Sequence, residues 1–256
     1  GDLSAAAIRH YCQLAKQSRR LDDKILKEPT GSLLEKLGLR DGKHLKRAAV
    51  LLFHPHPEQY ITAAYTKIGF FRSNTDLRFQ DEISGDLFTQ VEKAIELLLT
   101  KYLQAGISYH GIQRKETLPV PEAALREAVL NALIHKNYAE GAPVQISVYA
   151  DRLMIWNPGT LPDDWTVEKL LGKHASRPYN PDIANAFFRA GLIESWGRGI
   201  ERMVEACKQA GVPAPLVKVE ATGVWVEFVY SRPDALGIPE VTWQVTGQVT
   251  GQVTGQ

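Results

Sequence analysis

Apolar residues recur at intervals of three and four from residue 87 to residue 102, which predicts an amphipathic helix. Apolar and polar residues alternate over 144–149, and a short apolar run follows at 153–156, so these segments predict a hairpin. Residues 217–220 and 224–229 predict a second hairpin, turned by Ala221-Thr222-Gly223. Helical segments mixed with hairpins predict an α+β protein.

Other segments carry weaker patterns. The unbroken apolar run at 48–53 predicts a buried strand stopped by Pro55 and Pro57, and 61–71 predicts another strand region. Residues 32–39 predict a short helix with Ser32 as its N-cap. Asn180-Pro181 predicts a helix start, with Asn180 as the cap and Pro181 in the first turn, and Gly197-Arg198-Gly199 opens the next helix.

The chain has 256 residues, enough for one or two domains. Residues 1–31 are polar and charged and predict a helix and linker. Residues 32–118 predict an α/β subdomain, and a second unit at 119–231 begins with Pro119-Val120-Pro121. Residues 232–256 end in a Val-Thr-Gly-Gln repeat, which is too simple to form a core and is interpreted as a linker.

Composition narrows the class of protein. The net charge of +1 gives no overall basic field for nucleic acid. Cys12 and Cys207 have no metal-binding or redox spacing, which favours a reducing cytoplasmic location. The longest apolar run, at 48–53, is too short to span a bilayer, so no membrane association is expected.

A polar stripe crosses an otherwise apolar predicted helix at 125–137. Glu127, Asn131 and His135 follow one another at intervals of four and therefore share one helix face. Buried polar groups require partners, and a bound metal and phosphate would supply them. A solvated stripe, or a polar network satisfied within the protein, remains an alternative.

Two further segments have features that suit nucleotide binding. Asn157-Pro158-Gly159 follows a predicted strand, and the Asn157 amide can both donate to and accept from an adenine edge, although a plain turn would also have this sequence. Gly197 and Gly199 lie at a predicted helix start, where backbone N–H groups can bind phosphate. A tight turn before a helix is the alternative there.

Together these segments resemble the GHKL ATPases, in which Glu-x-x-x-Asn on a helix precedes a strand-end box and a glycine-rich helix start. More narrowly, "LREAVLNALIHKNY", "NPGTLP" and "RPYNPDIANAFFRAGLIESWGRGI" resemble the C-terminal ATPase-like domain of RecG-related, Schlafen-AlbA-type transcriptional regulators. The resemblance covers roughly 33–230. It implies a Bergerat-like α/β sandwich, a mostly antiparallel sheet with helices on one face, preceded by a smaller α/β domain.

The resemblance also implies roles for individual residues in binding ATP and Mg²⁺. Glu127 would orient or deprotonate the attacking water, and Asn131 would hold the Mg²⁺ ion that bridges the phosphates. Asn157 takes the place of the adenine-reading aspartate. The remaining residues assigned to the nucleotide, including candidates in a lid at 160–179, are His135, Gly159, Lys173, His174, Arg177, Gly197, Arg198 and Gly199.

Two departures from the GHKL pattern leave an alternative open. The strand-end box has Asn157 instead of an aspartate, and the second box keeps two glycines, Gly197 and Gly199. ATP turnover is therefore expected to be slow or absent, and a degenerate scaffold that binds no nucleotide and serves as a dimerisation platform is the alternative. A Walker A loop is missing, because the nearest segment, 38–44, has the wrong spacing.

The implied partners follow from the same resemblance. DNA would be bound through modules mostly outside these residues, and a homodimer is expected. Direct DNA binding by residues 1–115 is a further alternative, based on a set of basic residues: Lys16, Arg19, Arg20, Lys43, Lys46 and Arg47.

Overall fold

The computed structural model describes residues 3–103, 106–110, 113–162, 164–172, 175–194 and 196–231. The helices are α1 (Ala5–Ser18), α2 (Asp23–Leu26), α3 (Thr30–Lys36), α4 (Arg47–Phe53), α5 (Leu87–Leu97), α6 (Glu122–His135), α7 (Val167–Leu171), α8 (Pro181–Arg189) and α9 (Gly199–Ala210). The strands are β1 (Arg40–Asp41), β2 (His44–Leu45), β3 (Thr66–Ser73), β4 (Asp76–Ile83), β5 (Gly106–His110), β6 (Gln113–Thr117), β7 (Val144–Val148), β8 (Arg152–Asn157), β9 (Leu216–Glu220) and β10 (Gly223–Val229).

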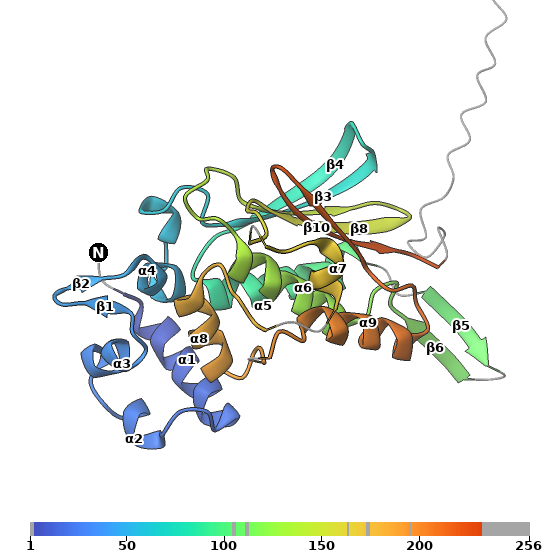
Figure 1. Ribbon diagram of the computed structural model, residues 1–256. Coiled ribbons are helices and arrows are strands. Elements are labelled where there is room, and N and C mark those ends of the chain that lie inside the picture. The colour runs from blue at the N-terminus through green and yellow to red at the C-terminus, as the bar shows by residue number, and fades with distance from the viewer. Residues whose placement is uncertain are drawn as a thin grey trace, which may run out of the picture.

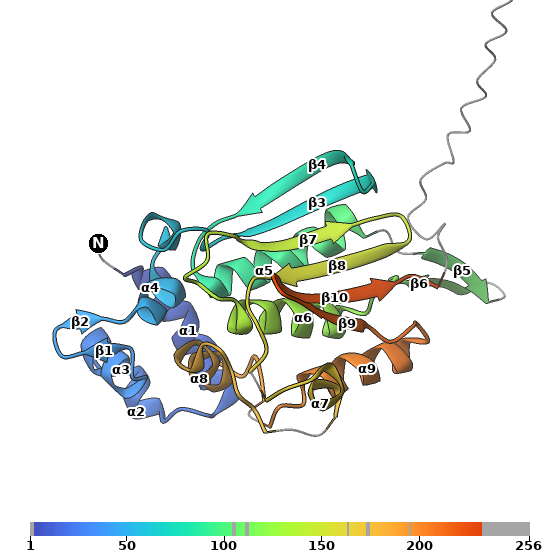
Figure 2. The same ribbon diagram turned by 45° about the horizontal axis from the view of Figure 1, so that its top comes forward.

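A six-stranded sheet in the order β4-β3-β7-β8-β10-β9 forms one layer of the molecule. Every neighbouring pair in this sheet is antiparallel except β3 and β7, which are parallel. Helices α5, α6 and α9 lie beneath one face of the sheet, and α1 to α4 and α8 gather at one end (Figure 1, Figure 2). The predicted mixed α+β architecture with a mostly antiparallel sheet is confirmed.

The six-stranded sheet contains strands from both sides of the boundary predicted at 118/119, which itself lies between β6 and α6. Strand β3, from the first predicted unit, pairs with β7, from the second, in the register Thr66↔Val144 to Phe70↔Val148. Both units also contribute to one hydrophobic core, and so does α1 through Tyr11 and Ala15, which are fully buried. The segment predicted as a helix and linker at 1–31 is therefore packed into the body of the protein, whereas the linker predicted at 232–256 lies outside the described residues.

The strand predicted at 48–53 is wrong, because these residues form α4. Ala49, Leu52 and Phe53 of this helix are fully buried, and Phe53 packs edge-on against Tyr11 of α1 at a centroid distance of 5.5 Å. A short helix that is apolar on nearly all sides shows no period of 3.6, so the sequence pattern alone cannot distinguish it from a buried strand.

Both predicted hairpins are confirmed, as β7–β8 and β9–β10. The helix predicted at 87–102 runs as α5 to Leu97 and continues as a π-helical turn from Leu98 to Tyr102. The helix predicted from Ser32 begins earlier, at Thr30, and Pro29 occupies its cap position without a side-chain hydrogen bond, so the predicted N-cap role of Ser32 is wrong. None of the helices in the described ranges is long and apolar enough to cross a bilayer.

Candidate functional site

The predicted polar stripe lies on α6, between α9 and strand β8 of the sheet. The helix is buried on most of its surface through residues such as Leu125, Val129 and Leu133. Exposure increases along the stripe, because Glu127 is buried, Asn131 is half-buried and His135 is exposed. The stripe therefore runs from the protein interior towards its surface, and a fully buried stripe is not what the structure shows.

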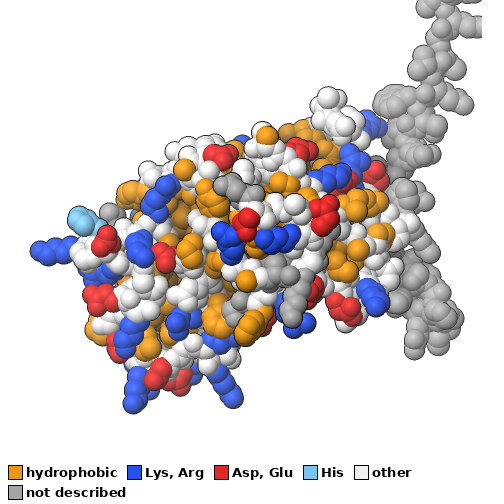
Figure 3. Space-filling view, viewed as in Figure 1, with side chains coloured by type: hydrophobic (Ala, Val, Ile, Leu, Met, Phe, Trp, Pro, Cys, Tyr) orange, Lys and Arg blue, Asp and Glu red, His pale blue; other side chains and the backbone are white. Residues whose placement is uncertain are grey.

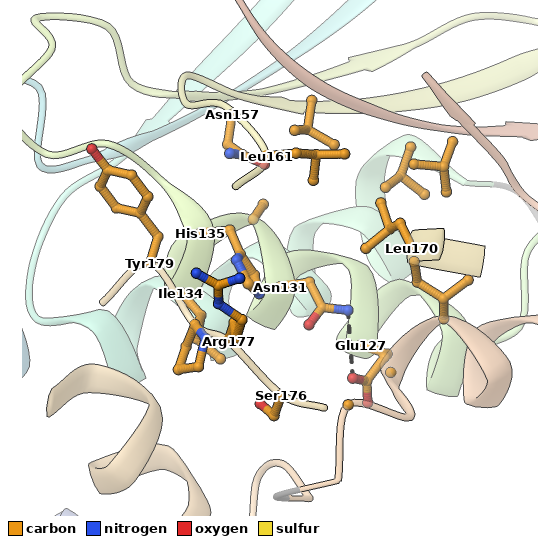
Figure 4. A pocket seen from close by; sticks show the side chains of 18 of the residues that line it. Glu127, Asn131, Ile134, His135, Asn157, Leu161, Leu170, Ser176, Arg177 and Tyr179 are labelled. Atoms are coloured by element: carbon orange, nitrogen blue, oxygen red, sulfur yellow. Dashed lines mark hydrogen bonds between the residues drawn. The ribbon is translucent and has the colours of Figure 1, made fainter. Parts of the chain in front are cut away.

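A cavity of about 570 Å³ opens along this stripe. Its walls come from α6, from β8 to β10, from the predicted lid and from the start of α9. Most of the residues assigned from the sequence line it: Glu127, Asn131, His135, Asn157, Arg177, Gly197, Arg198 and Gly199. Figure 4 shows Asn157 at the sheet side of the cavity, with Asn131 and Glu127 projecting from α6 opposite. Lys173 and His174 lie outside the described residues.

Glu127 and Asn131 form the polar floor of the cavity. Asn131 Nδ2 lies 3.5 Å from Glu127 Oε1 at a donating angle, and Arg202 Nη1 of α9 lies 3.7 Å from Glu127 Oε2. Burial raises the pKa of the Glu127 carboxyl; Arg202 and the Asn131 hydrogen bond lower it, and the nearby Glu194 raises it. A carboxyl with a raised pKa beside a cavity has the character of a general base.

Gly199 brings the start of α9 against this pair. A Cβ atom at position 199 would lie 2.5 Å from Glu127 Oε1 and 2.9 Å from Asn131 Nδ2. Glycine is therefore required for the first turn of α9 to approach the carboxylate. The free backbone N–H groups of that turn lie at the same end of the cavity, where an anion would be favoured.

Arg202 and Glu194 are site residues that the sequence analysis missed. Arg202 lies three residues after Gly199 and therefore on a neighbouring position of the same helix face, a spacing that could have indicated it. Glu194 lines the cavity from the α8–α9 connection, and no periodic pattern marks that segment.

Asn157 ends β8 with its side chain almost fully buried. Its Nδ2 donates to Pro158 O at 3.2 Å, which leaves the carbonyl oxygen Oδ1 as an acceptor for a ligand. Gly159 does not line the cavity but sits behind it: its φ is 142°, and a Cβ there would lie 2.9 Å from His135 O. Asn137 N donates to Pro158 O at 2.8 Å, so this glycine allows the strand end to pack against the end of α6.

The predicted lid at 160–179 borders the cavity and contains the short helix α7. Arg177 Nη1 donates to Asp164 Oδ1 at 2.8 Å, and Lys169 Nζ donates to Asp164 Oδ2 at 3.1 Å. These two cations lower the pKa of Asp164, with Lys169 as the main cause. Arg177, a predicted phosphate contact, is therefore paired with an acid that a phosphate group would have to replace.

Asn180 was predicted to cap α8, but its side chain binds the end of α6 instead. Its Nδ2 donates to Ile134 O at 2.7 Å and to Lys136 O at 2.8 Å, and no side-chain bond caps α8. The amide thus donates to carbonyl groups at the end of α6, which have no partner within their own helix. Asn180 thereby fixes the end of α6 against the start of α8.

The side chains around the cavity differ from a protein-only metal site. Within the described ranges no three His, Cys, Asp or Glu side chains gather as a metal-binding group. Three carboxylates line the cavity: Asp164 pairs with Lys169 and Arg177, Glu194 pairs with Arg20, and Glu127 lies beside the Asn131 amide. Protein-bound Mg²⁺ commonly takes one or two such ligands and completes its octahedron with phosphate oxygens and water. These residues therefore fit a Mg²⁺ ion that arrives with a polyphosphate better than a metal held by protein groups alone.

Three comparisons with known proteins bear on this site. Residues 141–228 match the protein family described as "Putative ATP-dependent DNA helicase recG C-terminal". The match includes Asn157, Arg177 and Gly199, but the whole of α6, which carries Glu127 and Asn131, lies outside it. No curated protein matches the sequence.

The solved structure of the DIP2311 protein from Corynebacterium diphtheriae is similar, with a TM-score of 0.71 and 23% sequence identity. The similarity covers 93% of this chain and 47% of that one, so the chain spans about half the length of that protein. This likeness shows a shared fold. The chain thus has the fold of a solved bacterial protein and, over residues 141–228, the sequence features of an ATPase-like family.

Proposed function

We propose that this chain binds ATP with Mg²⁺ in the cavity between α6 and the 160–179 lid, as a regulatory domain with slow ATPase activity. The observation that carries the proposal is the Glu127–Asn131 pair, which faces an open cavity closed at one end by the first turn of α9. The GHKL resemblance and the match to an ATPase-like family over 141–228 support it.

The two ends of the cavity suit the two ends of a nucleotide. The purine would lie at the sheet side, where Asn157 Oδ1 accepts a hydrogen bond and the valines of β9 and β10 provide apolar contacts: Val217, Val224 and Val226. The triphosphate would lie at the start of α9, near Arg198 and the N–H groups of that turn. Arg177 would exchange Asp164 for a phosphate oxygen.

Glu127 is the residue placed to activate water. Its carboxylate would accept a proton from the attacking water, while the Arg202 cation opposes the rise in its pKa that burial causes. Asn131 would present its amide oxygen to Mg²⁺. When bound, that ion neutralises phosphate charge and favours hydrolysis.

The cavity favours this proposal over a scaffold that binds no nucleotide. A scaffold would tolerate a pocket filled by Trp156, Trp165 or the lid. The cavity is open at about 570 Å³, with Trp165 as part of its wall. The replacement of an aspartate by Asn157 weakens recognition of the adenine amine but keeps an acceptor.

We assign DNA contact and homodimer formation to the protein as a whole, with DNA reached through modules outside these residues. Three of the basic residues considered for direct DNA binding have partners within the protein: Arg20, Lys46 and Arg47. On the face seen in Figure 3, basic and acidic side chains are interspersed. A basic face would be required for the phosphate contacts that dominate DNA affinity.

The test is a calorimetric titration of the purified protein with ATP in the presence of Mg²⁺. We expect saturable binding by the wild type and at least about a tenfold weaker affinity for Asn131→Ala, as for loss of a charge-assisted contact. Asn74→Ala, in the β3–β4 turn away from the cavity, is the matched control and should bind as the wild type does. Absence of saturable binding of any adenine nucleotide would end the proposal.

A further inference from the structure

Arg20, just after the end of α1, reaches the chain segment that connects α8 to α9. Its Nη1 donates to Phe188 O at 3.1 Å and to Ile193 O at 2.6 Å, and its Nη2 donates to Glu194 Oε1 at 2.7 Å. The guanidinium carbon also lies 4.6 Å from the centroid of the Phe188 ring. One side chain near the start of the chain thus donates to two carbonyl groups and one carboxylate. These acceptors lie 168, 173 and 174 residues later in the sequence.

A second contact holds the same segment to α1. Ser18 Oγ donates to Arg189 O at 2.5 Å, and Gly191 packs so closely that a Cβ there would lie 2.7 Å from Ser18 Cβ. The end of α1 therefore contacts the last turn of α8 and the first residues of the connection. Arg20 extends these contacts to Ile193 and Glu194.

The α8–α9 connection held by these contacts forms part of the cavity wall. Ile193 and Glu194 both line it, and so do Gly197 to Gly199 at the start of α9. Burial is the main cause of the raised pKa of Glu127, and the Glu194 charge acts in the same direction. The position of this connection therefore sets both the shape and the charge of the cavity at the start of α9.

Two physical effects of Arg20 act in the same direction. The planar guanidinium fixes the two carbonyl groups in a geometry that an ammonium group cannot reproduce, so the connection keeps its shape. The same group pairs with Glu194 and offsets a negative charge that would otherwise face an incoming polyphosphate. Both effects favour binding of an anion at the start of α9.

We propose that Arg20 is a positioning residue for the nucleotide site: it holds the α8–α9 connection in its binding shape, neutralises Glu194, and couples the N-terminal helix to nucleotide occupancy. This inference rests on the proposed ATP binding. It also implies reciprocity, because a ligand that stabilises the connection must stabilise the docking of α1 by the same free energy. Movement of α1 would then change the affinity for nucleotide.

The experiment compares ATP·Mg²⁺ affinity among variants of the full chain. We expect Arg20→Ala to weaken ATP binding by about tenfold, within the usual range of coupling between sites. Arg20→Lys keeps the charge but not the planar arrangement of donors. Its ATP affinity should be about threefold weaker than that of the wild type, between the wild type and Arg20→Ala. Lys16→Ala is the matched control, because it removes an exposed cation from the same helix, and it should bind as the wild type does.

Two additional measurements separate positioning from general destabilisation. Glu194→Gln introduced with Arg20→Ala should recover part of the lost affinity, since the unpaired negative charge is gone; a loss caused only by unfolding would not be recovered. Hydrogen exchange without nucleotide should rise in residues 191–199 of Arg20→Ala and stay unchanged in α6.

The outcomes distinguish the two proposals. If the wild type fails to bind ATP, the nucleotide proposal itself is lost. If the wild type binds and folded Arg20→Ala and Arg20→Lys bind within about twofold of it, the positioning role of Arg20 is overturned while ATP binding stands. Glu194→Gln is also made without the Arg20 substitution. If it then raises ATP affinity by the same factor as in Arg20→Ala, Glu194 acts independently of Arg20 and the coupling is overturned.

Discussion

Arg202 of α9 faces Glu127 of α6 across the floor of the cavity, with Arg202 Nη1 3.7 Å from Glu127 Oε2. Burial of the carboxyl raises its pKa, and this cation partly offsets the effect. Half of the Arg202 side chain is exposed, so solvent weakens the pair. The result is a buried carboxyl whose pKa is raised overall and which forms part of the cavity wall.

Replacing Glu127 with glutamine should nearly abolish ATP hydrolysis without preventing ATP binding. Glutamine keeps the size and the contact with Asn131 but cannot accept the proton of water, and loss of a general base typically costs about 10²–10⁴ in rate. Phosphate release and ATP affinity are measured together. Glu122→Gln, in the first turn of the same helix and paired with Arg126, is the control. An unchanged rate of phosphate release would show that Glu127 is not the base.

Glu127 should also make the stability of the protein depend on pH. Because its pKa is raised in the folded state, the folded protein holds a proton that the unfolded chain releases between the ordinary and the raised pKa. The free energy of unfolding therefore falls as the pH rises through that interval. We expect Glu127→Gln, which cannot ionise, to have a higher Tm than the wild type at neutral pH and an equal Tm below the ordinary carboxyl pKa. Thermal unfolding across pH checks this, and a difference that does not vary with pH would contradict it.

Gly199→Ala should damage the site while leaving the fold intact. The added methyl group would lie 2.5 Å from Glu127 Oε1, so the carboxylate or the start of α9 must move. Alanine is a better helix former than glycine, so the rest of α9 should be unaffected. We expect ATP affinity at least about tenfold weaker, with Tm within a few degrees of the wild type. Gly141→Ala, where the nearest atom would be Thr62 Cγ2 at 3.9 Å, controls for the substitution itself.

Asn180→Ala should destabilise the protein by about 2 kcal/mol, because two carbonyl groups at the end of α6 lose their side-chain partner. Denaturant unfolding measures this change. Asn74→Ala, which removes one exposed hydrogen bond with Arg152, should cost less than about 0.5 kcal/mol. A similar cost for both variants would mean that Asn180 does not hold α6 and α8 together.

Features that depend on near neighbours along the chain could be predicted from the amino-acid sequence. The hairpins β7–β8 and β9–β10 follow from alternation and turn residues, and the shared face of Glu127, Asn131 and His135 follows from the helical repeat. The order of the three motifs also indicated which segments would meet. The structure places eight of the assigned residues along one cavity: Glu127, Asn131, His135, Asn157, Arg177, Gly197, Arg198 and Gly199.

Features that depend on partners far apart in sequence could not be predicted in this way and are seen in the folded protein. The run at 48–53 is a helix whose last residue, Phe53, packs against Tyr11 of α1 and Phe88 of α5. The Asn180 side chain binds the end of α6 instead of capping its own helix. Arg20, Glu194 and Arg202 joined the site through contacts between segments far apart in sequence. Periodicity records which face of an element is apolar, but it does not record which other element covers that face, and the partners of a buried or half-buried polar group are set by that second choice.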